Sequence, residues 1–207
     1  MINRTIRYKE RRIMVRLYKS LVRPHLEYCV SAWSAHYLKD KELLERIQHR
    51  FTRMFKDLRQ RSYDERLKSL NLWTLEERRN RQDLIEVFKT YKGFTRLSND
   101  ELFERDANIK GTRGHTLRLK KKQSVRDVRR YFFSQRVVNR WNSLDQATVD
   151  MGSIKSFKGR LDKIRKTRMG FLWILHGPQS PRPRGDWTPV RPHKVSYKVS
   201  ISYVGGS

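Results

Sequence analysis

The chain has a single cysteine, Cys29, among its 207 residues. One thiol cannot form an intramolecular disulfide, and it cannot supply a cysteine cluster for zinc. The residues around it in the sequence are largely apolar, which predicts a buried and unreactive thiol. The cysteine count therefore excludes both a disulfide-stabilised fold and a zinc fold built on cysteines.

Long apolar runs are also missing. A helix that spans a bilayer needs about 20 consecutive apolar residues, and the run Phe171–Leu175 is far shorter. The N-terminal letters MINRTIRYKERR have no apolar stretch behind their charges, so they do not resemble a secretory signal. We expect an intracellular protein, in the nucleus or the cytoplasm, without a membrane partner.

Acidic residues are scarce. Asp and Glu number 21 against 48 Lys and Arg, which gives a formal net charge of +27. A surface of this charge attracts polyanions, in the first place nucleic acids and in the second anionic membranes. A solvated basic surface without a specific partner is the alternative. The imbalance is greatest near the C-terminus, where Asp186 is the only acid from Arg165 onward.

The sequence lacks the patterns that catalysis requires. It has no glycine-rich phosphate loop and no GxSxG motif, and its six histidines never stand at metal-ligand spacing. Its aspartates never form an adjacent pair, although a two-metal polymerase or nuclease needs clustered carboxylates to hold its ions. We therefore expect no catalytic residue, no metal, no cofactor and no small-molecule substrate.

The most apolar stretch before the C-terminal tail is 17–33, LYKSLVRPHLEYCVSAW. Its first residues repeat at helical spacing, until Pro24 removes a backbone donor and disfavours helical dihedrals at Arg23. We expect one helix over 8–22 and a second that starts at Pro24 and runs to Trp33. The second helix is apolar nearly all round, which predicts that it is buried.

Basic residues form a stripe on the helix over 8–22 and another on a helix expected over 39–58, each beside an apolar face. Basic stripes of this kind can follow a phosphate backbone. A solvated helix face is the alternative for both. The candidate nucleic-acid contacts are Arg12, Arg16, Lys19, Arg23, Arg46, Arg50 and Arg53.

Local signals mark the elements that follow. The segments 62–65 and 74–77 match the capping box that starts a helix, and Asn71 between them suits a left-handed turn. A weak alternation over 115–122 predicts a short strand, paired with 124–130. Helical periodicity returns at Tyr131. The expected fold is mainly α, an amphipathic helical bundle with at most one short β-hairpin and an irregular C-terminal tail.

Five segments together resemble a known family. In chain order they are LYKSLVRPHLEYCVSAWS, KDKELLERIQHRFTRM, SYDERLKSLNLWTLEERRNRQDLIEVFKTYKG, TRGH and RRYFFSQRVVNRWNSL. Over about residues 2–171 the chain resembles the C-terminal part of the reverse transcriptase polyprotein of jockey-like non-long-terminal-repeat retrotransposons. It departs from the family pattern at Ala35, at Phe55-Lys56 and at Asn71, where the family usually has Pro, Ile-Pro and Gly. The two proline losses predict a longer helix from Lys39.

The resemblance implies a thumb-like helical domain over 1–93, a linker with the expected strand over 94–122 and a C-terminal helical region over 123–171. The tail 172–207 is expected to be disordered or unrelated. In related polymerases the thumb holds primer–template duplex beside a catalytic palm, whose paired aspartates this chain lacks. The resemblance thus implies a non-catalytic fragment of an RNA-directed DNA polymerase that binds RNA or RNA–DNA duplex, with the palm as a further partner. A helical interaction module, or a non-functional product of a degenerate element, is the alternative.

Overall fold

The computed structural model describes residues 10–106 and 114–167, all within the compact unit Met1–Gly177. These residues are mainly helical, which confirms the expected fold class. None of their helices is both long enough and apolar enough to cross a membrane. The tail expected over 172–207 lies outside the described residues. The boundaries expected at 93 and 122 stay predictions.

The first helix does not end before Pro24. Helix α2 (Arg11–Leu17) continues through a π-helical segment (Tyr18–Val22) into α3 (Arg23–Leu26). A proline inside a helix lacks an N–H and its ring clashes with the carbonyl four residues earlier. The wider π turn directly before Pro24 gives the ring room, so the helix passes through it. The prediction of a second helix from Pro24 to Trp33 is wrong.

The stretch after α3 is only partly buried. Leu26 and Val30 are buried, whereas Tyr28 is 72% exposed and Trp33 is 46% exposed. Cys29 is exposed and has a φ of 48°, in the left-handed region. The predictions of an all-round buried helix and a buried thiol are therefore wrong. The turns after Leu26 set the direction of each side chain, and helical periodicity no longer applies to them.

Helix α4 (Leu38–Thr52) ends before the predicted Leu58, and a 3-10 turn (Lys56–Leu58) follows. Phe55 lies in extended backbone between them, which returns its ring to the core. There Phe51 stacks on Tyr18 with 4.2 Å between ring centroids, and Phe55 meets Phe51 edge-on at 5.6 Å. The longer helix expected from the missing prolines is thus wrong, because burial of Phe55 favours the turn.

Both capping boxes are confirmed. Ser62 caps α5 (Tyr63–Leu70) and Thr74 caps α6 (Leu75–Tyr91), each with the glutamate three residues on bonding back to the cap. Asn71 between the two helices has φ 48° and ψ 52°, which confirms the left-handed turn. The sequence predicts both caps because a capping box depends on two side chains only three residues apart, which bond the free amides at the start of the helix.

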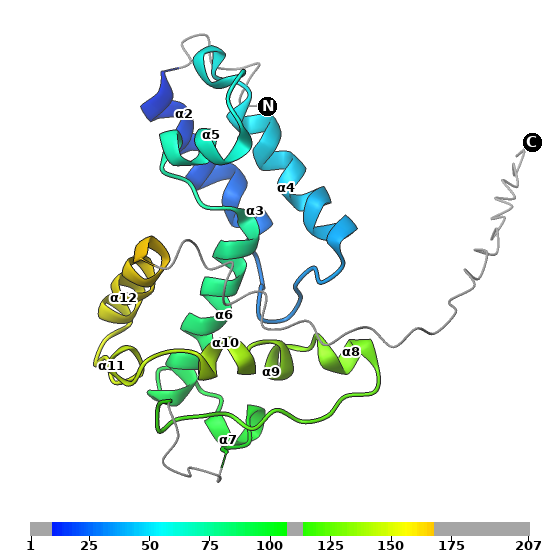
Figure 1. Cartoon of the computed structure of the whole chain (residues 1–207), viewed down its shortest axis with the longest axis vertical. Helices are drawn as coiled ribbons and strands as arrows, with labels where there is room; N and C mark the ends of the chain where they lie inside the picture. Colours follow the sequence, from blue (N-terminus) through cyan, green and yellow to red (C-terminus); the bar gives the residue numbers. More distant parts are fainter. Residues whose placement is uncertain (1–9, 107–113, 168–207) are drawn as a thin grey trace, which may run out of the picture. The chain divides into compact units, whose positions relative to one another are not determined.

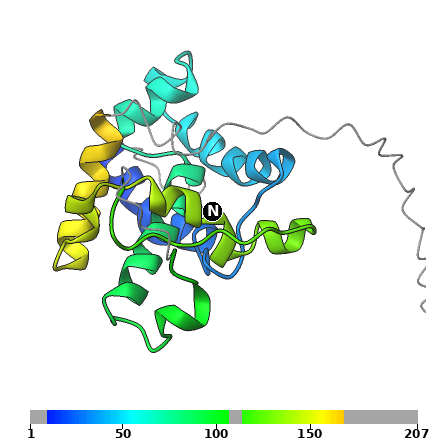
Figure 2. The ribbon, with the colours of Figure 1, turned by 60° about the horizontal axis from the view of Figure 1, so that its bottom comes forward.

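Short helices follow α6. They are α7 (Asn99–Leu102), α8 (Asp127–Arg130), α9 (Phe133–Arg136), α10 (Val138–Asn142), α11 (Gln146–Val149) and the longer α12 (Ile154–Thr167). In both views α12 and α8 lie on opposite sides of α6 (Figure 1, Figure 2). The expected β-hairpin over 115–130 is wrong: Leu119 forms an isolated bridge with Arg105, and the region of the second strand contains α8.

Two apolar clusters hold the described residues together. One joins Met14 and Tyr18 to Phe51 of α4, to Phe55 after it and to the leucines of α5. The other joins α6 to the later helices, with Trp141 and Phe157 fully buried. In it Phe88 of α6 stacks on Phe157 of α12 at 4.2 Å. Helix α6 is also in contact with α4, so it connects the N-terminal and C-terminal helices.

Candidate nucleic-acid interface

The first basic stripe lies opposite the buried residues of its helix. Met14 and Tyr18 are fully buried, while Arg12 and Arg16 are exposed on the other side of α2. The π segment then changes the register that the sequence predicted, because it has more residues per turn than an α-helix. From Lys19 onward the stripe is therefore no longer a straight continuation of Arg12 and Arg16.

Lys19 and Arg23 belong to a cationic cluster with Arg78 of α6. Both are half-buried, and Arg23 lies 3.7 Å from the carboxylate of Glu27, which also takes two bonds from Arg78. Burial, followed by the charges of Arg23 and Arg78, lowers the pKa of Lys19. Arg23 and Arg78 share the Glu27 carboxylate, and both repel Lys19, so a further anion would relieve the repulsion among the three cations.

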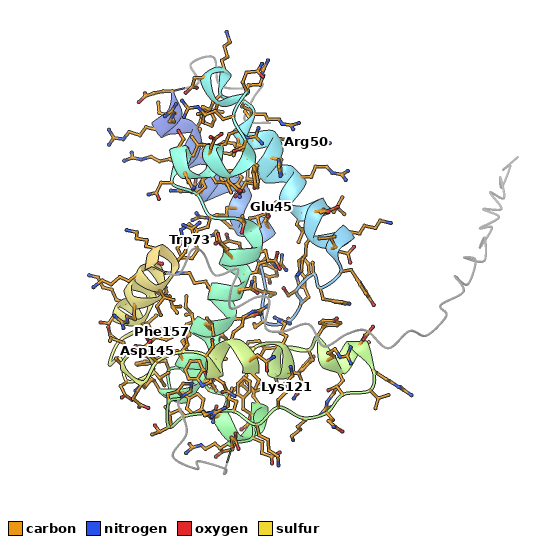
Figure 3. The ribbon with its side chains drawn as sticks, viewed as in Figure 1. Glu45, Arg50, Trp73, Lys121, Asp145 and Phe157 are labelled. Carbon is orange, nitrogen blue, oxygen red and sulfur yellow. The ribbon has the colours of Figure 1, made fainter. Side chains whose placement is uncertain are left out.

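The second stripe lies on the outward side of α4. Arg46, Arg50 and Arg53 are exposed, and Gln48 and Thr52 on the opposite side are fully buried. Figure 3 shows Arg50 on this outward side. The three arginines stand at helical spacing along α4 and its C-terminal residue, which makes a row of positive charge about two turns long.

The structure does not bring the two stripes into one surface. The buried faces of the two helices meet where Tyr18 stacks on Phe51 and donates a hydrogen bond to Gln48 (2.8 Å). Since each stripe lies on the far side of its own helix, the two stripes turn away from each other. Arg12 and Arg16 form one positive surface, and Arg46, Arg50 and Arg53 form another.

The exposed arginines of both stripes have no ionic partner within the part of the chain that the structure describes. They are Arg12, Arg16, Arg46, Arg50 and Arg53. Four arginines of the later helices differ, since Arg81, Arg136, Arg160 and Arg165 each form an ion pair. The basic side chains thus divide into a group that holds the fold and a group that faces solvent unpaired.

Two arginines hold the turn region after α3, and the sequence did not reveal them. Arg79 of α6 donates to the backbone carbonyls of Leu26 (2.9 Å) and Trp33 (3.1 Å), and its guanidinium lies 4.1 Å from the Trp33 ring centre. Arg136 of α9 donates to the carbonyl of Val30 (2.6 Å). In sequence both look like solvated bases, because their acceptors are backbone groups far away in the chain.

A carboxylate balances this pair of arginines. Asp83 of α6 accepts two hydrogen bonds of 2.9 Å from Arg136. Burial raises the pKa of the Asp83 carboxyl, although the bonds from Arg136 oppose the rise. The side chain of Asp83 is 1% exposed, so the ion pair is almost dry.

A polar network in the N-terminal cluster also escaped prediction. Gln48 donates to the hydroxyl of Tyr63 (3.0 Å) and to the carbonyl of Trp73 (2.9 Å). Glu45 accepts from Tyr63 and from the first amide of α6, at Leu75 (2.9 Å). Burial raises the pKa of Glu45. The network fixes α4 against the start of α6, so it determines where the row of arginines on α4 points.

Among the described residues no group of three His, Cys, Asp or Glu side chains is placed to hold a metal ion. The observed arrangement offers positive surfaces and hydrogen-bond donors. Its chemistry suits the binding of anions. No protein-family model, no curated protein and no solved structure matches the chain.

Proposed function

We propose that this chain is a non-catalytic, nucleic-acid-binding C-terminal fragment of a reverse transcriptase of the jockey-like retrotransposon type. It binds RNA or RNA–DNA duplex through phosphate contacts and acts inside the cell. The observation that carries the proposal is the set of exposed arginines without ionic partners on α2 and α4. The sequence resemblance supplies the identity of the parent protein, and the charge of +27 supports a polyanionic partner.

The arginines on α4 have the form that phosphate binding needs. A guanidinium presents several donors in a plane and binds phosphate oxygens in pairs. The polar network of Glu45 and Gln48 fixes the helix that carries them. Lys19 and Arg23 add a partly buried cationic cluster on the first helix, where phosphate would relieve the repulsion among the cations.

The first prediction concerns the α4 row. We expect the triple variant Arg46→Gln, Arg50→Gln, Arg53→Gln to bind a short RNA–DNA duplex more weakly than the wild type. Each lost phosphate contact should reduce the slope of log affinity against log salt by about 0.9, by analogy with B-DNA. Fluorescence anisotropy over a salt series measures both quantities.

A matched control removes the same charge elsewhere. Lys68, Lys155 and Lys158 are exposed on α5 and α12, and their triple Gln variant should keep nearly the wild-type slope. Equal slopes for the two triple variants would contradict a specific role of the α4 row. Binding that is flat with salt, or absent at low salt, would overturn the whole proposal. Primer extension by the purified chain should be blank.

A second candidate function is an interaction module that is completed by a reverse transcriptase palm. The observation that favours it is a set of exposed apolar side chains within one stretch of the chain. The set is Leu21, Tyr28, Trp33, Tyr37 and Leu38, which are 46% to 72% exposed. Exposed apolar residues in such number mark interaction sites when they form a continuous patch.

Mixing with a separately produced palm domain tests this candidate. If the palm covers this stretch, Leu38→Lys should abolish a complex that sedimentation velocity detects for the wild type. Leu97 is 53% exposed and lies outside the stretch, so Leu97→Lys is the control. Failure of the wild type to form any complex would count against the module.

A further inference from the structure

The segment 120–130 carries a dense positive charge that neither stripe includes. Its basic residues are Lys120, Lys121, Lys122, Arg126, Arg129 and Arg130, against the single acid Asp127, and all of them are exposed. Figure 3 shows Lys121 on the segment that leads to α8. Val125 in the middle is 99% exposed, so the segment does not bury an apolar face.

Beside this segment lies a cavity of about 220 Å³. Its walls come from the end of α7 and the residues that follow it, from Lys120 and Lys122, from α8 and from the start of α9. The side chains that matter for binding are Glu104, Lys120, Lys122, Arg129 and Phe132. The cavity is smaller than the roughly 300 to 1,000 Å³ of pockets that enclose a whole ligand. It therefore suits one small anionic group and a neighbour that lies on its rim.

The charges of the cavity would let a bound anion replace the Glu104 carboxylate as the counter-ion of the lysines. Glu104 lies 2.5 Å from the ammonium of Lys120 and 3.2 Å from that of Lys122. These two lysines lower the pKa of Glu104, so the carboxylate is charged and acts as their internal counter-ion. Arg129 has no ion pair or side-chain hydrogen bond in the described part of the chain. One cation is thus free, and two are held by a single exposed carboxylate.

An aromatic ring completes the site. Phe132 lines the cavity and is 52% exposed. Its neighbour Tyr131 stacks on His36 with 4.1 Å between ring centroids, which ties the turn between α8 and α9 to the loop before α4. Proteins that bind single-stranded nucleic acid combine cations along the backbone with exposed aromatic rings on which bases stack.

We propose that this cavity binds one nucleotide of single-stranded nucleic acid, with its phosphate at Lys122 and Arg129 and its base on Phe132. The inference rests on the proposed function in taking nucleic acid as the polyanion. It adds a second surface and assigns that surface to single strands. Duplex bases are stacked and paired, so they cannot lie on Phe132, whereas an unpaired base can.

The test uses the full chain and a labelled single-stranded oligo-uridine RNA. Phe132→Ala should weaken binding about tenfold, the typical effect of losing one base–aromatic stack. It should leave binding of inorganic polyphosphate unchanged, because polyphosphate has no base. Arg129→Gln should weaken binding of both probes more than Lys121→Gln, which removes the same charge from a residue that does not line the cavity.

Glu104→Gln gives the sharpest readout. It frees Lys120 and Lys122 from their counter-ion, so both probes should bind severalfold more tightly. A purely structural role of Glu104 would not strengthen binding. Thermal unfolding of each variant, followed by circular dichroism, shows whether the fold is intact.

Wild-type RNA binding by folded Phe132→Ala, or equal losses in Arg129→Gln and Lys121→Gln, would overturn the cavity proposal. So would Phe132-dependent binding of anionic vesicles or of a phosphopeptide without any effect on RNA. The α4 triple variant with the RNA–DNA duplex tests the proposed function separately. If the α4 triple variant binds the RNA–DNA duplex like the wild type while Phe132→Ala weakens RNA binding, the proposed function is wrong and the cavity proposal stands. If the α4 triple variant weakens duplex binding while Phe132→Ala binds RNA like the wild type, the cavity proposal is wrong and the proposed function stands.

Discussion

Asp83 and Arg136 form the most buried ion pair among the described residues, with side chains 1% and 10% exposed. A dry pair contributes little net stability compared with an apolar pair of the same size. Removing one partner is costly, because it leaves a charge without water or counter-charge. Arg136 also bonds to the carbonyl of Val30, so its loss would release the turn region after α3 as well.

We therefore expect Arg136→Met to lower the free energy of unfolding by about 3 to 5 kcal/mol in urea denaturation. The double variant Asp83→Leu, Arg136→Met should recover much of the loss. Arg160→Met breaks an ion pair with Asp145 in which both side chains are about 40% exposed, so its cost should be about 0 to 1 kcal/mol. Equal costs for Arg136→Met and Arg160→Met would contradict this account.

His115 gives the fold a dependence on pH. Its side chain is buried, and its Nε2 atom donates to the carbonyl of Trp141 at 2.9 Å. Burial lowers the pKa of His115. The unfolded chain takes up a proton near pH 6.5, whereas the folded chain takes it up only at a lower pH, so the free energy of unfolding should fall as the pH drops below 6.5.

The slope for one such proton is at most about 1.4 kcal/mol per pH unit. His115→Gln should flatten the slope between pH 7 and 5, since an amide does not titrate there. Some slope should remain, because burial and neighbouring arginines also lower the pKa of His49. His25 is exposed, and His25→Gln is the control. Urea denaturation at several pH values measures the dependence of the free energy of unfolding on pH. If this dependence is the same in His115→Gln as in the wild type, His115 is not its source.

At the scale of helices, the start of α6 is the point where several elements join. Thr74 accepts from the amide of Glu77 at 3.1 Å, and the Glu77 carboxylate bonds back to Thr74 and to Arg165 of α12 at 3.0 Å. Glu45 of α4 takes the amide of Leu75. One capped turn therefore fixes the positions of α4 and α12 relative to α6.

Loss of this cap should be measurable. Thr74→Ala should lower the free energy of unfolding by about 1 kcal/mol, and Thr74→Ser should be close to neutral because the hydroxyl remains. Chemical denaturation of the two variants checks the difference. If Thr74→Ala cost nothing, the bonds from Glu45 and Glu77 alone would suffice to start α6.

The sequence predicted those elements whose signals are local. The caps at Ser62 and Thr74 and the left-handed Asn71 each depend on residues within a few positions, so the pattern alone specifies them. The passage of the helix through Pro24 depends on the π-helical turn before it, and the early end of α4 depends on burial of Phe55. Helical periodicity reveals neither a local change of helix type nor a packing partner that is distant in sequence.

The candidate site was predictable to a similar extent. Helical spacing placed Arg46, Arg50 and Arg53 together on an outward face, as the structure has them. Spacing failed for Lys19 and Arg23, because the π segment shifts the register. It also could not separate the exposed arginines from Arg79 and Arg136. That difference depends on which carbonyls lie within reach after folding.

At the scale of the whole molecule, the charge of +27 repels itself in the folded chain. A polyanion that binds the folded surface stabilises the folded chain, so we expect inorganic polyphosphate at low salt to raise the midpoint of thermal unfolding. The rise should largely vanish at 1 M salt, where the screening length is only about 3 Å. Differential scanning fluorimetry measures both. A rise that persisted at 1 M salt would indicate contacts other than charge.

The bond from Arg136 to Val30 also bears on how the protein is made. These residues are 106 positions apart. At the usual 5 to 20 residues per second, a ribosome needs roughly 5 to 20 seconds to get from one to the other. During that interval Val30 is already synthesised, and Asp83 emerges without its cation. The bond from Arg136 to this turn region can therefore form only late in translation, after α9 has been made. A nascent chain that stalls before Arg136 would hold the turn region through Arg79 alone, and the buried carboxylate of Asp83 would lack its counter-charge.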